Sequence, residues 1–152
     1  MIEREVQFGD ARVPLPEGWD DHTEESEGLP TLYRGDGVGA LQFTVGSYRG
    51  GKAPQPSDEE LTGLLESQVR QAGLSSPPEH AMLQHGPMRW VTASLRSKDI
   101  FYRLWLGSDG LNLVFATYNV ACDSRSTEEE AEVDAIIAGL RFPEPGALRK
   151  AS

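Results

Sequence analysis

Hydrophobic and polar residues alternate along several short segments of the chain, and this period of two predicts β-strands. Residues 40–48 show it best, because Leu41, Phe43 and Val45 would point to one side and the residues between them to the other. A glycine and an aspartate at Gly9-Asp10 indicate a turn or a β-bulge inside the first strand segment. The expected strands span residues 6–15, 30–34, 40–48, 79–84, 88–96, 100–106 and 111–121.

A first helix is expected between residues 57 and 73, where apolar residues recur three or four positions apart. Ser57 and Glu60 have the spacing of a capping box, in which each side chain binds the other residue's free backbone N–H. Gly73 is the expected C-terminal stop. The apolar stripe consists of Leu61, Leu64, Leu65, Val69 and Ala72.

A second helix is expected from about residue 127 to residue 140. Either of two residue pairs could form its capping box, and the sequence leaves both open. The pairs are Ser126 with Glu129 and Thr127 with Glu130. The stripe that this helix would bury consists of Val133, Ile136, Ile137 and Leu140.

The order of these elements, strands then helix then strands then helix, predicts an α+β fold. Short links between the later strands favour an antiparallel sheet, on which the two amphipathic helices would pack. A chain of 152 residues has the size of one domain. We expect a single domain over residues 1–142 and a C-terminal tail over residues 143–152.

Three short motifs resemble the PsbP/DcrB superfamily, which includes Mog-type Ran-binding proteins. They are the turn Pro16-Glu17-Gly18-Trp19, the strand 39–45 with the sequence GALQFTV, and an acidic helix that runs into Arg141-Phe142. The resemblance covers roughly residues 6–142 and implies an α-β-α sandwich. It implies no single activity, because members of the superfamily bind different partners and generally lack catalysis.

The excess of acidic over basic residues makes some classes of binding partner less favourable than others. The chain has 24 acidic and 14 basic residues, a net charge of −10. This charge disfavours nucleic acids and anionic membranes, and it favours a basic protein. No signal peptide or membrane-spanning run is visible, and Cys122 has no second cysteine to pair with, so a cytoplasmic protein is expected.

The residues that could carry chemistry lack the partners that chemistry requires. His22, His80, His85 and Cys122 do not have the spacing of metal ligands, and no Gly-x-Ser-x-Gly motif is present. The glycine-rich run 35–39 lacks the Gly-Lys-Ser/Thr of a phosphate loop and is interpreted as a hairpin turn. We therefore expect no catalytic residue, no metal and no cofactor.

Two acidic clusters and one loop remain as candidate binding sites. The helix 127–140 carries one cluster, part of which would serve the positive end of the helix. The other cluster follows Trp19, which could be either a core residue or the centre of a docking patch. Tyr48, Arg49 and Lys52 lie in the loop before the first helix. The candidate partner-binding residues are Trp19, Asp20, Asp21, Glu24, Glu25, Tyr48, Arg49 and Lys52.

The sequence therefore predicts a non-enzymatic, cytoplasmic binding protein. Its most concrete form is an immunity-like or antitoxin-like protein that neutralises a basic partner. A secretion-accessory chaperone or adaptor is an alternative, and it would require a homodimer with an apolar groove. A small-ligand-binding domain is a second alternative, with its pocket between the sheet and a helix.

Overall fold

A seven-stranded antiparallel sheet forms the centre of the fold in the computed structural model, which describes residues 4–47, 57–74, 80–110 and 112–142. Its strands are β3 (Trp19–Asp21), β4 (Thr31–Arg34), β5 (Gly39–Ser47), β6 (Ala81–His85), β7 (Met88–Ser97), β8 (Ile100–Ser108) and β9 (Asn112–Ala121). They lie in the order β3-β4-β5-β9-β8-β7-β6. The strands β6 to β9 form the predicted meander. The strand β5 joins this meander by pairing with β9, which is distant from it in the sequence.

The alternation predicted for residues 40–48 is confirmed along β5. Leu41 and Phe43 are buried, whereas Thr44 is exposed. In the register with β9, Leu41 lies opposite Tyr118 and Phe43 opposite Ala116, both of which are buried. Directly opposed residues share a face of the sheet, so these four side chains belong to one core.

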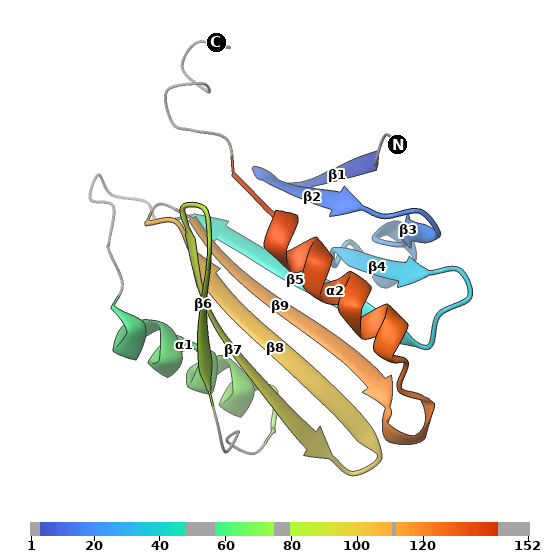
Figure 1. The fold of residues 1–152 in the computed structure, drawn as a ribbon. Helices are drawn as coiled ribbons and strands as arrows, with labels where there is room; N and C mark the ends of the chain where they lie inside the picture. The colour runs from blue at the N-terminus through green and yellow to red at the C-terminus, as the bar shows by residue number, and fades with distance from the viewer. Residues whose placement is uncertain (1–3, 48–56, 75–79, 111, 143–152) are drawn as a thin grey trace.

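The helix α1 (Asp58–Gln71) covers β7 and β8 on one face of the sheet (Figure 1). The predicted capping box is present, with Ser57 accepting from the backbone of Glu60 and Glu60 accepting from the backbone of Ser57. Gly73 follows the helix with a φ of 78°, which only glycine adopts readily. Most of the predicted stripe is buried and packs against the sheet residues Val91, Ala93, Leu95, Leu104 and Leu106.

The helix α2 (Thr127–Gly139) lies on the opposite face, together with the hairpin of β1 (Arg4–Phe8) and β2 (Ala11–Leu15) (Figure 1). Two backbone hydrogen bonds between Arg12 and Arg141, of 2.7 and 3.0 Å, tie the residues just after α2 to this hairpin. The two helices therefore lie on either side of the sheet, and the predicted α+β sandwich is confirmed. The core on this face includes Trp19, Phe43, Trp90, Trp105, Tyr118, Val133, Ile136 and Ile137.

Two local expectations differ from the structure. The segment after Trp19 belongs to none of the expected strands, but Asp20 and Asp21 pair with β4 as part of β3. Two aspartates disfavour a strand, but pairing with β4 overrides that preference. Leu64 and Ala72 were expected in the buried stripe of α1, yet Leu64 is 37% exposed and Ala72, which follows the last residue of the helix, is exposed as well. Among the described residues no helix is long and apolar enough to cross a membrane. The expected tail, residues 143–152, lies outside the described residues.

Candidate functional site

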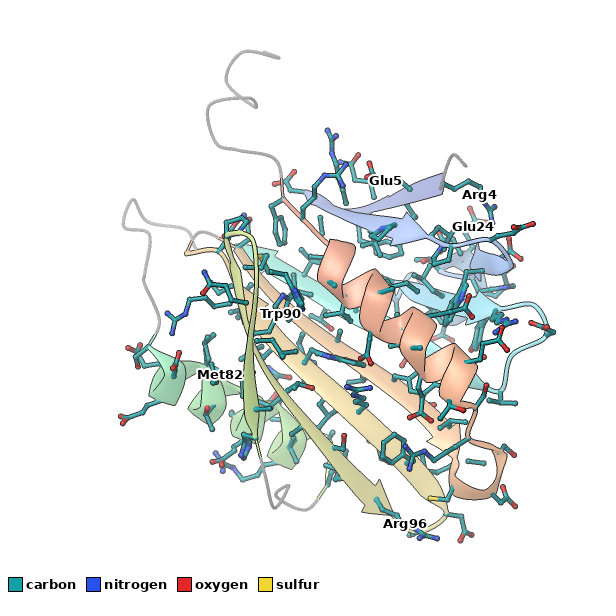
Figure 2. The ribbon with its side chains drawn as sticks, viewed as in Figure 1. Arg4, Glu5, Glu24, Met82, Trp90 and Arg96 are labelled. Carbon is teal, nitrogen blue, oxygen red and sulfur yellow. The ribbon has the colours of Figure 1, made fainter. Side chains whose placement is uncertain are left out.

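Five exposed carboxylates gather at the edge of the sheet formed by β3 and the short 3-10 helix η1 (Glu24–Ser26). We call this surface the acidic edge, and it consists of Asp20, Asp21, Glu24, Glu25 and Glu27. Figure 2 shows Glu24 here, with Arg4 of β1 at the same end of the molecule. Among the described residues, two basic groups contact these carboxylates: the guanidinium of Arg4 lies 3.6 Å from Asp20, and the ring of His22 lies 3.8 Å from Glu25. Both are exposed contacts that add little stability.

The backbone of the acidic edge is held by polar contacts within a tight turn. The carboxylate of Asp21 accepts hydrogen bonds from the backbone N–H and the hydroxyl of Thr23, the first of 2.9 Å. The N–H of His22 donates to the carbonyl of Thr31 at 2.8 Å, which ties the turn to β4. Asp21 therefore shapes the turn, whereas the carboxylates of Asp20, Glu24 and Glu25 accept no hydrogen bond from another described residue.

Exposed apolar and aromatic side chains accompany these acids. Tyr33 lies directly opposite Asp20 in the register of β3 and β4 and is 37% exposed. The ring of His22 contacts the ring of Tyr33 edge-on, with the centroids 5.0 Å apart. Leu29, in the connection to β4, is 40% exposed. The acidic edge thus combines negative charge with exposed apolar and aromatic area.

Trp19 does not belong to this surface, which corrects its inclusion among the candidate binding residues. Its side chain is fully buried in the core beneath α2. Neighbouring residues of a strand point to opposite faces, so Trp19 turns inward while Asp20 turns outward. The carbonyl of Trp19 accepts a hydrogen bond of 2.6 Å from Arg4. The other candidates, Tyr48, Arg49 and Lys52, lie outside the described residues.

The acids of α2, by contrast, are engaged within the protein. Arg34 of β4 contacts Glu132 at 2.7 Å, Glu128 at 3.4 Å and Asp36 at 2.7 Å. Partial burial alone would lower the pKa of Arg34, but these three carboxylates raise it. Arg103 contacts Asp134 at 2.9 Å, and Arg125 contacts Glu130 at 2.8 Å. The contacts of Arg34 and Arg103 therefore link α2 to β4 and β8, whereas Arg125 binds the first turn of α2 from the connection that precedes it.

Glu129 has a role that the sequence analysis missed. It is buried, and its carboxylate accepts hydrogen bonds from the N–H of Val38 at 3.1 Å and of Gly39 at 2.9 Å. The hydroxyl of Tyr118 donates to the same carboxylate. Ser126 accepts from the N–H of Glu129, so only half of the expected capping box forms. One signal was available: Glu129 lies four residues before Val133, on the stripe that the helix buries.

The same contacts explain the glycine-rich run 35–39. It forms the expected turn between β4 and β5, closed by a 2.9 Å hydrogen bond from the N–H of Gly37 to the carbonyl of Arg34. The backbone N–H groups of Val38 and Gly39 bind an anion, as the N–H groups of a phosphate loop do. Here the anion is the carboxylate of Glu129 in the same chain. The pKa of Tyr118 lies far above its ordinary value. Burial of the phenol is the larger cause, and the hydrogen bond to Glu129 is the next.

The residues with catalytic or metal-binding chemistry are scattered. In the described part of the chain, no group of three or more His, Cys, Asp or Glu residues is placed to hold a metal ion. Cys122 is half-buried beside Asp123 in an open hollow of about 440 Å³ near the β7–β8 turn. His80 lines a different groove, between α1 and β6, and His22 belongs to the acidic edge.

Comparison with known proteins supports the fold and goes no further. No protein-family model and no curated protein matches the chain. Among solved structures, the chain is similar to the cyanobacterial PsbP (CyanoP) of Synechocystis sp. PCC 6803, with 11% identity, a TM-score of 0.59, and coverage of 93% of this chain and 92% of that chain. A structure from Bacteroides thetaiotaomicron VPI-5482 aligns with 15% identity, a TM-score of 0.56 and 90% of this chain. This chain spans 46% of that Bacteroides chain. The PsbP-like fold expected from the sequence is confirmed.

Proposed function

We propose that this chain is a non-enzymatic domain that binds a basic partner protein at the acidic edge. The observation that carries the proposal is the contrast between the two acidic clusters. The acids of α2 contact Arg34, Arg103 and Arg125, whereas Asp20, Glu24 and Glu25 are exposed and have only weak contacts with Arg4 and His22. Exposed charges that are held only by weak contacts within the protein are available to a partner.

The physical effect of such a surface is mainly on the rate of association. A net charge of −10 attracts a cationic protein over distances longer than a contact, and the acidic edge directs where it lands. The exposed parts of Tyr33 and Leu29 then supply apolar contact area at the same place. Aromatic residues surrounded by polar ones commonly contribute most of the binding free energy.

The most concrete form of this function is an immunity-like or antitoxin-like protein of the cytoplasm, which covers the cationic site of a toxin. A secretion-accessory adaptor would use the same charge but would also self-associate. A small-ligand-binding domain would use the open groove of about 400 Å³ between α1 and β6. The acidic edge favours the first form, because a cationic active site is the natural complement of exposed carboxylates.

The experiment is to co-express the chain with the proteins encoded beside it and to measure association rates for any complex at several salt concentrations. The variant Asp20→Lys/Glu24→Lys/Glu25→Lys leaves Asp21 to shape the turn. We expect it to slow association by about tenfold or more and to weaken the dependence on salt. The control, Asp10→Lys/Asp99→Lys/Asp123→Lys, makes the same change in net charge at exposed positions elsewhere.

Two results would contradict the proposal. The first is that none of the neighbouring proteins binds. The second is that the two triple variants slow association equally, which would mean that net charge matters and the acidic edge does not.

A further inference from the structure

The two edges of the central sheet are protected very differently. At one edge, β3 has three residues, two of which are aspartates. At the other edge, β6 has five residues, Ala81–His85, and none of them is a carboxylate, a lysine, an arginine, a glycine or a proline. Proteins usually protect a free edge with short strands, charges or prolines, because its unpaired N–H and C=O groups can pair with another chain.

The edge strand β6 is also apolar and accessible. Met82 is 40% exposed and Leu83 is 36% exposed. The register places Met82 opposite Val91, on the face that α1 covers, and Leu83 opposite Trp90, on the face of α2. Met82 on β6 and Trp90 on the adjacent β7 are labelled in Figure 2. An added strand would therefore find apolar contacts on both faces of β6.

A groove of about 400 Å³ runs beside β6, on the face of α1. Met82 of β6 and His80, the residue just before β6, line one side of it, and the acids Asp58, Glu59 and Glu66 line it from the helix. Asp58 is paired with Arg89, and Glu66 lies 3.8 Å from Nε2 of His80. Glu59 is exposed, so the groove presents net negative charge next to the edge where a strand would be added.

We propose that β6 binds an extended segment of a partner protein in which apolar and basic side chains alternate. The backbone of that segment would extend the sheet, its apolar side chains would contact Leu83, and its basic side chains would lie beside Glu59 and Glu66. Alternation follows from strand geometry, because successive side chains point to opposite faces. This site is separate from the acidic edge, which lies at the other end of the sheet.

A second copy of this chain fits the edge less well. Two copies paired antiparallel through β6 would be related by an axis perpendicular to the sheet, and both α1 helices would lie on the same face. Glu59 and Glu66 of one copy would then approach the same residues of the other. Like charges at this seam oppose self-association and favour a basic segment instead.

The probe is a short blocked peptide in which valine and lysine alternate, titrated into the full chain and followed by NMR. We expect the amides of β6 to shift and to exchange more slowly with solvent at saturation. A peptide with glutamate in place of lysine should bind about tenfold more weakly or worse, because its charge repels the groove. Binding of both peptides with equal affinity would overturn the proposal.

Two backbone controls separate strand addition from simple charge attraction. One lysine peptide is N-methylated at its valines and the other at its lysines. In an antiparallel ladder, alternate residues direct their N–H groups to the same neighbour, so strand addition predicts that only one of the two peptides retains binding. Charge attraction alone predicts that both bind, and that result would overturn the proposal.

Variants of the protein locate the site. Leu83→Lys and Glu59→Lys should each weaken the binding of the lysine peptide, whereas Val38→Lys should not, because Val38 is exposed in the distant β4–β5 turn. The triple variant of the acidic edge should bind the peptide as the natural chain does. Loss of binding in that variant alone would overturn the β6 site and leave the acidic edge. Self-association that Leu83→Lys abolishes would make a second copy the occupant and would also overturn the proposal.

Discussion

Glu129, in the first turn of α2, accepts a 2.9 Å hydrogen bond from the backbone N–H of Gly39, at the start of β5. The two residues are 90 positions apart in the chain. Through this contact and the hydrogen bond from Tyr118, one buried carboxylate joins α2, β5 and β9. The stability of the sandwich should therefore depend strongly on Glu129.

Removing the carboxylate in Glu129→Ala should lower the free energy of unfolding by about 2–5 kcal/mol. The substitution leaves the N–H groups of Val38 and Gly39 and the hydroxyl of Tyr118 without their acceptor. Urea denaturation measures the change. Glu128→Ala is the control, because Glu128 is exposed and makes only a long contact with Arg34, and it should cost less than about 1 kcal/mol. Equal effects of the two variants would contradict the structural role of Glu129.

Stability should fall in alkaline solution because of Tyr118. The phenol is protonated in both states below its ordinary pKa of about 10. Burial and Glu129 raise the pKa in the folded protein, so above that pH the unfolded chain releases the proton and the folded protein keeps it. The free energy of unfolding then decreases as pH rises, by at most about 1.4 kcal/mol per pH unit for one proton.

Urea midpoints measured between about pH 9 and pH 11 test this dependence, since the range brackets the ordinary pKa of tyrosine. Tyr118→Phe should flatten the decrease relative to the natural chain, although its stability at neutral pH will also change. Tyr33→Phe, which alters an exposed ring, should leave the decrease in place. If Tyr118→Phe leaves the pH dependence as steep as before, another group causes it.

Gly39 should not tolerate a side chain. A Cβ at this position would lie 2.7 Å from the carbonyl oxygen of Asn119 and 2.7 Å from the ring of Tyr118. Gly39→Ala should therefore lower the free energy of unfolding by about 1–3 kcal/mol, because a buried strand has to move. Gly46→Ala, in the same strand, is the matched control, since nothing lies within 4 Å of its Cβ. Thermal denaturation should show a lower Tm for the first variant than for the second.

Leu65 and Leu64 are adjacent in α1 but differ in burial. Leu65 is fully buried in the cluster between α1 and the sheet, whereas Leu64 is 37% exposed. Leu65→Ala should cost about 2–5 kcal/mol, because it leaves a cavity against β7 and β8. Leu64→Ala should cost less than half of that amount. Similar losses in urea denaturation would mean that the helix faces the sheet differently.

Much of the fold could be predicted from the sequence because it depends on residues that are close together in the chain. The capping box of Ser57 and Glu60, the stop at Gly73 and the alternation along β5 each involve only a few neighbouring positions. The pattern also identified both helices and the antiparallel meander. The candidate site was predicted less completely, since the sequence identified an acidic cluster but did not exclude Trp19 from it.

The sequence by itself determined which elements form and which of their faces are apolar, because hydrophobic periodicity and capping are local. Only the tertiary structure decided what those faces meet. It pairs β5 with β9, buries Trp19 and gives the carboxylate of Glu129 to the amides of Val38 and Gly39. These contacts join residues that are far apart in the chain. The pattern of polar and apolar positions does not show which distant residue each of them will contact. The same limit explains why the acids of α2 and those of the acidic edge look alike in sequence and differ in the folded protein.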